Sequence, residues 1–176
     1  QEIARLQKEL NEKQEKLRIG QTAYHRESSR LESLKNITER YDGYGNSIRR
    51  VMANKEKEKG LIGVVADIIK VDKEYEIAIE TALGESIQNI VTDNEETAKR
   101  MIAFLKKNKF GRATFLPLTS MRGSIGLRNE EALREKGVIG LANTLVHVEK
   151  QFEGLAAQLL GRTIVVRTID DGIAIA

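Results

Sequence analysis

The residue types that could do chemistry are few in this sequence, and the largest group of them is cationic. Eight basic residues fall between positions 97 and 129 with no acidic residue among them: Lys99, Arg100, Lys106, Lys107, Lys109, Arg112, Arg122 and Arg128. This stretch carries a charge of +8, whereas the whole chain of 176 residues has a net charge of only +3. Such a band suits the phosphate backbone of DNA, which cations bind through counterion release without reading bases.

An amphipathic helix is predicted over residues 93–108, and it would carry most of this band. Asp93 is suited to its N-cap, with Glu96 three residues later. An apolar stripe follows at helical spacing: Ala98, Met101, Ile102 and Leu105. Steps of about 100° per residue place Lys99 and Lys106 together on one flank of that stripe, and Arg100 and Lys107 together opposite it.

We therefore predict non-specific DNA contact through this helix and the segment after it, by Lys99, Arg100, Lys106, Lys107, Lys109 and Arg112. The alternative is a solvated helix face whose cations pair with acids from nearby: Glu95, Glu96, Glu130 and Glu131. Aromatic residues make up only 5% of the chain, which argues against a platform for stacking single-stranded bases.

The sequence contains few residues of the types that usually carry out catalysis. The chain has no cysteine and two histidines, so disulfides, thiolate metal sites and cysteine nucleophiles are excluded. No phosphate-binding loop, dinucleotide fingerprint or zinc-protease motif occurs, and residues 123–126 (GSIG) are one residue short of a nucleophile elbow. The pair Asp170 and Asp171 is interpreted as helix capping, and His147 as a strand residue without a visible partner. We predict no catalytic residue, metal or cofactor.

Residues 1–41 predict a long solvated helix with a seven-residue repeat. This segment has no proline and one glycine, Gly20. Apolar residues recur at the two seam positions of the repeat: Ile3, Leu6, Leu10, Leu17, Tyr24, Leu31 and Leu34. One helix cannot bury such a stripe, so the pattern indicates a coiled coil. Because no second heptad run follows, we expect the partner helix to come from outside these 176 residues.

Lys13, Gly20 and Glu27 interrupt the seam in its middle, and pairing is expected to be weakest there. The alternative is a single amphipathic helix packed on the following domain. At about 1.5 Å per residue, however, the segment would extend about 60 Å, which is longer than a domain of the remaining size is wide.

The composition changes at residues 42–45 (DGYG), and strand-like and helix-like segments alternate after that point. In the first set we expect one long or two short buried strands over 61–71, strands over 87–92 and 112–116, the last stopped by Pro117, and helices over 75–83 and 93–108. A loop over 118–127 leads to a second set. It contains a helix capped by Asn129, strands over 138–141, 145–148 and 163–168, a helix over 149–160 and a helix capped by Asp170.

The predicted fold class is therefore mixed α and β (α+β) in two lobes, preceded by a long coiled-coil helix. We assign residues 1–41 to the arm, 42–119 to the first lobe and 120–176 to a second lobe that is incomplete at its C-terminal end. The first residue is Gln1 and Ala176 lies within an apolar stretch, so we expect the sequence to be an excerpt.

Several stretches resemble the hinge domain of the structural-maintenance-of-chromosomes (SMC) proteins. They are residues 60–72 (GLIGVVADIIKVD), 75–84 (YEIAIETALG), 87–91 (IQNIV), 111–118 (GRATFLPL) and 160–166 (LGRTIVV). The resemblance covers roughly residues 43–176, and the arm before it is also typical of the family. It is closer to the bacterial, homodimeric type, and the absence of Cys-x-x-Cys separates the chain from the zinc-hook relatives.

The resemblance implies a two-lobed module that joins two copies at the end of a coiled coil whose other end carries an ATP-binding head. An isologous pair would bury the same patches on both copies. In the family a glycine-rich segment and the returning helix follow beyond residue 176. We expect the interface to include Gly111, Arg112, Thr114 and Leu116, because a β-rich segment that ends at Pro117 suits a sheet edge. The alternative is that this segment is an internal core strand.

Two other functions stay open at this stage: a DNA-binding α/β module that does not dimerise, and a small ligand-binding domain whose loops 118–127 or 141–144 line a pocket. The longest apolar run, residues 61–66, is far below the ~18 residues that a membrane span needs. We expect a cytoplasmic, nucleoid-associated protein in which this segment is not an enzyme and the ATPase sites lie in the heads.

Overall fold

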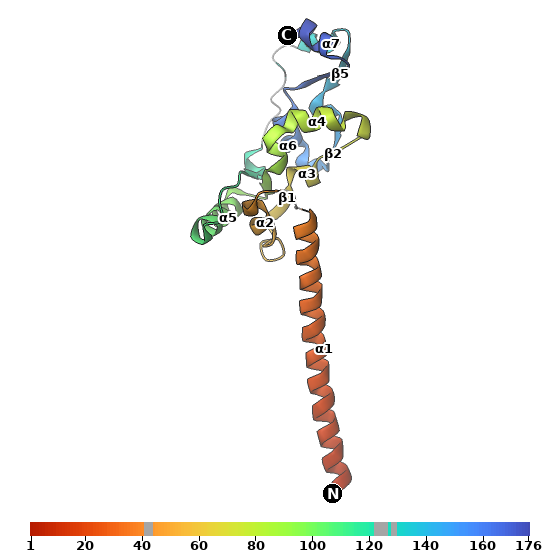
Figure 1. Cartoon of the computed structure of the whole chain (residues 1–176), viewed down its shortest axis with the longest axis vertical. Coiled ribbons are helices and arrows are strands. Elements are labelled where there is room, and N and C mark those ends of the chain that lie inside the picture. Colours follow the sequence, from red (N-terminus) through yellow and green to blue (C-terminus); the bar gives the residue numbers. More distant parts are fainter. Residues whose placement is uncertain (41–43, 122–126, 128–129) are drawn as a thin grey trace. The chain divides into compact units, whose positions relative to one another are not determined.

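The computed structural model describes residues 1–40, 44–121, 127 and 130–176. The chain divides into two units, Gln1–Gly43 and Tyr44–Ala176. The first contains one helix, α1 (Glu2–Arg40), of 39 residues, which confirms the long N-terminal helix (Figure 1). At about 1.5 Å per residue it is about 58 Å long.

The seam residues of α1 are exposed. Six of them are between 55% and 74% exposed: Ile3, Leu6, Leu10, Leu17, Tyr24 and Leu31. The seventh, Leu34, is half-buried. The polar face carries ion pairs along the helix, Arg5 with Glu9 at 3.3 Å and Arg18 with Glu15 at 2.6 Å. Pairing with a second helix stays a prediction, and the uncovered stripe is what such pairing would bury.

The second unit begins with α2 (Asn46–Met52) and then runs through a β and α series. The series is β1 (Leu61–Val64), α3 (Val65–Ile68), β2 (Lys70–Val71), the 3₁₀ turn η1 (Lys73–Tyr75), α4 (Glu76–Leu83), the 3₁₀ turn η2 (Gly84–Gln88), β3 (Ile90–Thr92) and α5 (Glu95–Asn108). It closes with β4 (Phe115–Pro117) and η3 (Leu118–Ser120). These elements confirm the mixed α and β class.

The same series then recurs. After η4 (Glu130–Arg134) come β5 (Val138–Leu141), η5 (Ala142–Thr144), β6 (Val146–His147), η6 (Lys150–Phe152), α6 (Glu153–Leu160), β7 (Ile164–Val166) and α7 (Ile169–Ile175). The sequence repeats with the elements, since residues 60–65 (GLIGVV) return as 137–142 (GVIGLA). The second unit is therefore an internal duplication.

Strand pairing repeats in detail. β1 pairs antiparallel with β3, with a bulge between Leu61 and Gly63, and β5 pairs antiparallel with β7, with a bulge between Val138 and Gly140. β4 adds to β3 in parallel and completes a sheet in the order β1-β3-β4. The first repeat thus has a three-stranded sheet, and the second has the two-stranded sheet β5-β7.

The two repeats join through the short strands β2 and β6. These strands pair antiparallel with Lys70 opposite His147, two residues that hold the same position in their repeats. Pairing between equivalent residues is what a two-fold relation between the repeats requires. Asp72 Oδ1 accepts a hydrogen bond from His147 Nε2 at 3.2 Å, so His147 has an acidic partner that its sequence neighbours did not reveal.

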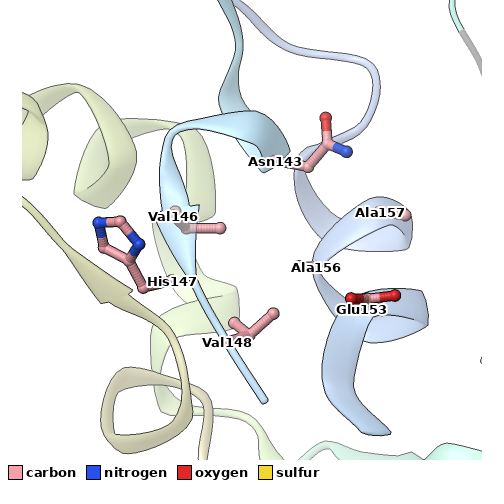
Figure 2. Close-up of a pocket in the computed structure, with 7 residues that line it drawn as sticks. All are labelled: Asn143, Val146, His147, Val148, Glu153, Ala156 and Ala157. Atoms are coloured by element: carbon pink, nitrogen blue, oxygen red, sulfur yellow. The ribbon is translucent and has the colours of Figure 1, made fainter. Parts of the chain in front are cut away.

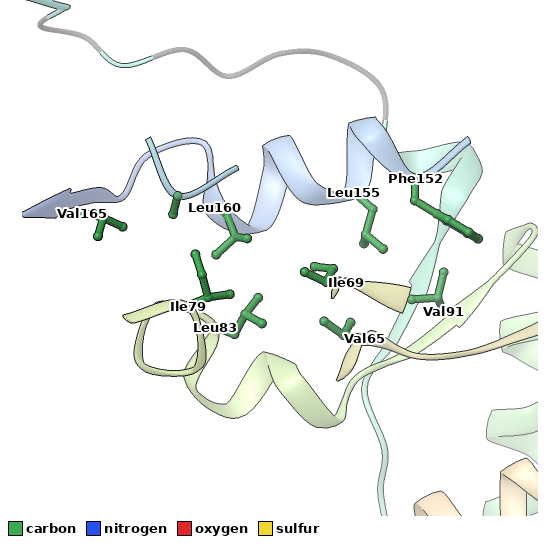
Figure 3. Packing of buried hydrophobic residues seen from close by; sticks show 10 residues of the cluster. Val65, Ile69, Ile79, Leu83, Val91, Phe152, Leu155, Leu160 and Val165 are labelled. Atoms are coloured by element: carbon green, nitrogen blue, oxygen red, sulfur yellow. The ribbon is translucent and has the colours of Figure 1, made fainter. Parts of the chain in front are cut away.

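One apolar core draws on both repeats. Figure 3 shows Leu155 and Leu160 of α6 on one side of it and Ile79 and Leu83 of α4 on the other. Leu155 and Leu160 are both 0% exposed. Side chains of both halves of residues 44–176 therefore contribute to one core.

A second group of buried side chains covers the first sheet and fixes α2 and α5. It consists of Ile48, Val51, Met52, Leu61, Val64, Ile90, Ala98, Met101 and Leu105. α5 is amphipathic, so its apolar stripe packs inward and its charged residues stay outside. This packing positions the cationic band.

Several sequence-based boundaries were wrong. The strand expected over 112–116 instead spans Phe115–Pro117, and Pro117 tolerates an edge position because it has no N–H to donate. Residues 61–71, expected as one long or two short strands, form the two short strands β1 and β2 with α3 between them. The N-cap of α5 is Asn94, which accepts a hydrogen bond from the backbone N–H of Thr97 at 3.0 Å, and that of α7 is Thr168. The predicted cap Asn129 lies outside the described residues, and 130–134 form a 3₁₀ turn.

Candidate functional site

The cationic band lies on α5 and the segment that follows it. Lys99, Arg100, Lys106 and Lys107 are all exposed on the helix, and Lys109 is its C-cap in the left-handed conformation, with φ of 54°. Arg112 is exposed three residues later. The fold therefore brings the six predicted DNA-contacting residues onto one element and its immediate continuation.

The N-terminal part of the band is neutralised by acids. Lys99 forms an ion pair with Glu96 at 3.0 Å, one turn away on the same helix. Arg100 pairs with Glu58 at 3.0 Å and also donates to Thr97 Oγ1 at 3.2 Å. The Glu58 carboxylate raises the pKa of Arg100 above its ordinary value. Lys99 and Arg100 therefore attract a phosphate less strongly than cations without an acidic partner.

The C-terminal part of the band is not neutralised in this way. Lys106, Lys107, Lys109 and Arg112 form no ion pair with an acidic side chain in the part of the chain that the structure describes. Lys106 and Lys107 occupy the last turn of α5, where the helix dipole favours positive charge. These four cations are the stronger candidates for contact with an anion.

Two further cations beside this group were missed by the sequence reasoning. Arg49 and Arg50 lie in the last turn of α2, which packs against α5. The Arg50 guanidinium lies over the ring of Phe110 at 4.7 Å, and Phe110 contacts Phe104 edge to face. The Arg-Arg pair just after the arm was the available signal, but only packing shows that it adjoins α5.

A hollow of about 670 Å³ lies against the same end of α5. It is lined by Ile102, Leu105, Lys106, Lys109, Gly111, Arg112 and Ala113. Ile102 is 51% exposed although it belongs to the apolar stripe of the helix. The hollow thus combines an apolar floor with a cationic rim.

The predicted interface residues lie around the edge of the first sheet. Leu116 is in β4, the edge strand of the order β1-β3-β4, and is half-buried against the core. Gly111, Arg112 and Thr114 lie in the exposed extended segment before it. The Arg112 carbonyl accepts from Ser47 Oγ at 2.6 Å, and Gly111 has φ of +99°, a conformation that favours glycine.

A polar clasp fixes the segment after β4 to the start of α5. The Glu95 carboxylate accepts hydrogen bonds from Ser120 Oγ at 2.6 Å and Thr119 Oγ1 at 2.7 Å. These hydroxyls lower the pKa of Glu95 to about 2. Glu95 is thereby held ionised at the start of α5, where its charge also acts on Lys99.

A second hollow, of about 500 Å³, lies between β6 and α6. Figure 2 shows Val146 and Val148 pointing toward the helix that carries Ala156 and Ala157, with Asn143 at one end. Asn143 Oδ1 is buried and has no hydrogen-bond partner among the residues that the structure describes. This hollow lies beside residues 141–144, one of the two loops expected to line a pocket.

Metal-binding and membrane-spanning features were sought over the same residues. In the described ranges no three His, Asp or Glu side chains gather as a metal site would require. Among the described helices, none has the length and hydropathy needed to cross a bilayer.

Comparison with known proteins decides the family. Residues 58–176 match the family described as "SMC proteins Flexible Hinge Domain". This chain belongs to the SMC hinge family. The resemblance carried by GRATFLPL and the other stretches is thus confirmed.

Similar proteins agree with this assignment. Over 169 residues the chain is 36% identical to the chromosome partition protein Smc of Lactiplantibacillus plantarum, a match that covers 95% of this chain and 14% of that protein. The chain thus spans about one seventh of the length of this curated relative. Its globular unit and arm correspond to a hinge region, not to the whole of an Smc protein.

Two solved structures share the fold. An asymmetric dimer of the Geobacillus stearothermophilus SMC hinge domain matches with a TM-score of 0.72 at 32% identity, over 85% of this chain and 62% of that chain. The Pyrococcus furiosus Smc hinge domain with an extended coiled coil matches with a TM-score of 0.55 at 25% identity, over 84% of this chain and 57% of that chain. The SMC hinge fold of this chain is therefore shared with bacterial and archaeal Smc proteins.

Proposed function

We propose that this chain is the homodimerisation hinge of an Smc protein that partitions chromosomes. The observation that carries the proposal is the edge position of β4 beside an exposed extended segment, in a chain of the hinge family. An edge strand offers unpaired backbone groups to another strand. The related Geobacillus hinge is a dimer, which supports the same assembly for this chain.

The interface is proposed to include Gly111, Arg112, Thr114 and Leu116. A substitution at Thr114 tests this proposed interface, because the Thr114 side chain is exposed next to the edge strand. Thr114→Lys would place a charge in a surface that dimerisation desolvates, and we expect the dissociation constant to rise at least about ten-fold. Thr81→Lys on α4, also at an exposed threonine, is the matched control. Equal dimerisation of both variants in sedimentation equilibrium would remove these residues from the interface.

The arm is proposed to form a coiled coil with a returning helix of the same full-length chain, through Ile3, Leu6, Leu10, Leu17, Tyr24, Leu31 and Leu34. The uncovered apolar stripe of α1 supports this pairing. The extended coiled coil of the Pyrococcus hinge supports it as well.

Non-specific DNA contact is the second part of the proposed function. All six band residues are candidates, and the structure favours the four without an acidic partner, together with Arg49 and Arg50. Phosphate contact by such cations gives affinity that falls with salt and does not depend on sequence. The rest of the proposed role is a segment without turnover, head domains elsewhere in the full-length protein that hydrolyse ATP, and a place on the nucleoid in the cytoplasm; membership of the hinge family supports it.

The division of the globular unit into lobes 42–119 and 120–176 is kept as a proposal. The internal duplication supports it, because each lobe would hold one repeat. A DNA-binding module that does not dimerise is the competing function. It predicts a monomer by mass at every concentration at which DNA is bound.

A further inference from the structure

The buried polar residue Ser47 contacts the segment to which the dimer interface is assigned. Ser47 lies in the first turn of α2 and is only 8% exposed. Its Oγ donates a hydrogen bond of 2.6 Å to the backbone carbonyl of Arg112, which is 65 residues further along the chain. Because a buried hydroxyl keeps its partner wherever it can, this bond ties the segment to the helix.

The segment between α5 and β4 has few other anchors. Backbone hydrogen bonds hold its two ends: the Phe110 N–H donates to a carbonyl of α5 at 3.1 Å, and the Thr114 carbonyl accepts from an N–H of β3 at 2.9 Å. Between these ends, residues 111–113 have one hydrogen bond to the part of the chain that the structure describes, and it is the bond from Ser47. The path of this stretch therefore depends on α2.

A second side chain of α2 holds the same segment. The Arg50 guanidinium lies over the Phe110 ring at 4.7 Å, and that ring packs edge to face on Phe104 at 5.6 Å. Ser47 and Arg50 are three residues apart, so they lie on the same side of α2. The helix thus contacts the segment at Phe110 and again at Arg112.

Gly111 lies between these two contacts and lets the chain pass close to α2. Its φ of +99° is a conformation that favours glycine. A Cβ built at this position would lie 3.7 Å from Ser47 Cβ, which is van der Waals contact. The turn at Gly111 brings the Arg112 carbonyl within reach of the Ser47 hydroxyl.

We infer that Ser47 is a positioning residue of the dimer interface: through its bond to Arg112, α2 holds residues 111–114 in the path from which β4 pairs with a second copy. The inference rests on the proposed homodimer and its interface. Because Ser47 is buried, it acts through the segment and not by its own contact with the partner. Fixing the segment in advance spares the cost of ordering it on association, and ordering the backbone of one residue corresponds to about ten-fold in an equilibrium constant.

Removal of the hydroxyl tests this role. In the full-length Smc protein without nucleotide, we expect Ser47→Ala to raise the dimer dissociation constant at least about ten-fold in sedimentation equilibrium. Ser47→Thr keeps the hydroxyl and should restore most of the affinity. The control is Asn54→Ala, which removes a hydrogen bond of the same kind beyond the other end of α2, from Asn54 Nδ2 to the Arg50 carbonyl at 2.9 Å, and should leave the dissociation constant unchanged. Thermal unfolding checks that each variant is folded at the temperature of the assay.

A reversible cross-link tests the same contact without the hydroxyl. The 3.7 Å between the two Cβ positions falls within the range of a disulfide, about 3.5–4.5 Å, and the chain has no cysteine of its own. In the Ser47→Cys, Gly111→Cys protein, oxidation should lower the dimer dissociation constant at least about ten-fold relative to the reduced form of the same protein. Peptide mass after digestion shows whether the disulfide has formed. The wild-type protein, oxidised and reduced in the same way, is the control and should not change.

The wild type and Thr114→Lys separate this inference from the proposed function. A wild-type protein that is a monomer at every concentration overturns the homodimer, and the role of Ser47 with it. If Thr114→Lys weakens the dimer and Ser47→Ala weakens it no more than Asn54→Ala does, the interface stands and Ser47 does not position it. Equal affinity of the oxidised and reduced double-cysteine protein overturns the inference as well, and the Ser47→Ala comparison decides alone if the disulfide does not form.

Discussion

Neutralising Arg49, Arg50 and Lys107 together should weaken DNA binding on every sequence and reduce its dependence on salt. These cations are grouped where α2 packs against α5, and none of them lines the hollow or forms an ion pair with a described acid. Each phosphate contact contributes about 0.9 to the slope of log affinity against log salt on duplex DNA. Loss of three contacts therefore lowers the slope by about 2.7.

The effect is large enough to measure. Between 50 and 200 mM salt, a slope lower by about 2.7 means that the wild-type chain loses about 40-fold more affinity than the Arg49→Gln, Arg50→Gln, Lys107→Gln variant. Fluorescence anisotropy with duplexes of two unrelated sequences, over a salt series, gives both slopes. Thermal unfolding of the variant checks that loss of the Arg50 contact with Phe110 has not disturbed the fold.

The matched control is Lys99→Gln with Arg100→Gln, which removes two cations that already pair with Glu96 and Glu58. Its slope should fall by less than about one. If the control lowers the slope as much as the triple variant does, the distinction between neutralised and available cations is wrong. If neither variant changes the slope, none of the five cations changed in these variants contacts DNA.

Three further outcomes test the fold that positions these surfaces. Leu155→Ala in the shared core should lower the free energy of unfolding by about 2–5 kcal/mol in a denaturant titration, whereas Ile77→Ala at an exposed position should change it by under about 0.5 kcal/mol. Asn94→Ala removes the cap of α5 and should cost about 1 kcal/mol in the same assay, and an unchanged midpoint would contradict the capping bond. The pKa of Glu95 is lowered to about 2, so the stabilisation it gives is present above about pH 4.5 and is lost as the pH falls toward 2. The melting temperature of the Glu95→Gln variant should therefore fall less on acidification than that of the wild type. Equal falls in melting temperature would contradict the clasp.

The sequence predicted those features that depend on local pattern. The heptads of residues 1–41 indicated a long helix, and the apolar stripe through Ala98, Met101 and Leu105 indicated α5, since both patterns have the helical period. The pairing of Lys99 with Glu96 was also foreseeable, because the two residues are one turn apart on α5.

Features that depend on contacts between distant segments were not predicted. Glu58 pairs with Arg100 only because the chain before β1 lies beside α5, and Asp72 meets His147 only through the pairing of β2 with β6. The caps were each assigned one or two residues away from their true positions, because Asp93, Asn94, Thr168 and Asp170 are all suited to capping by type.

The duplication was the largest feature missed, although its signal was present in the sequence. Residues 60–65 and 137–142 share their glycines and apolar pattern, and an aromatic residue follows each at Tyr75 and Phe152. The repeats also differ at many positions. The exchange of charged residues on α5 for Ile169 and Ile173 on α7 is one such difference.

The central claim is that residues 44–176 hold a second copy of the same chain. Sedimentation equilibrium of the full-length Smc protein, beside a version in which residues 44–176 are replaced by a short flexible linker, tests it most directly. We predict a dimer for the intact protein at micromolar concentration and a monomer for the version without the hinge. Equal masses for the two proteins would contradict the claim.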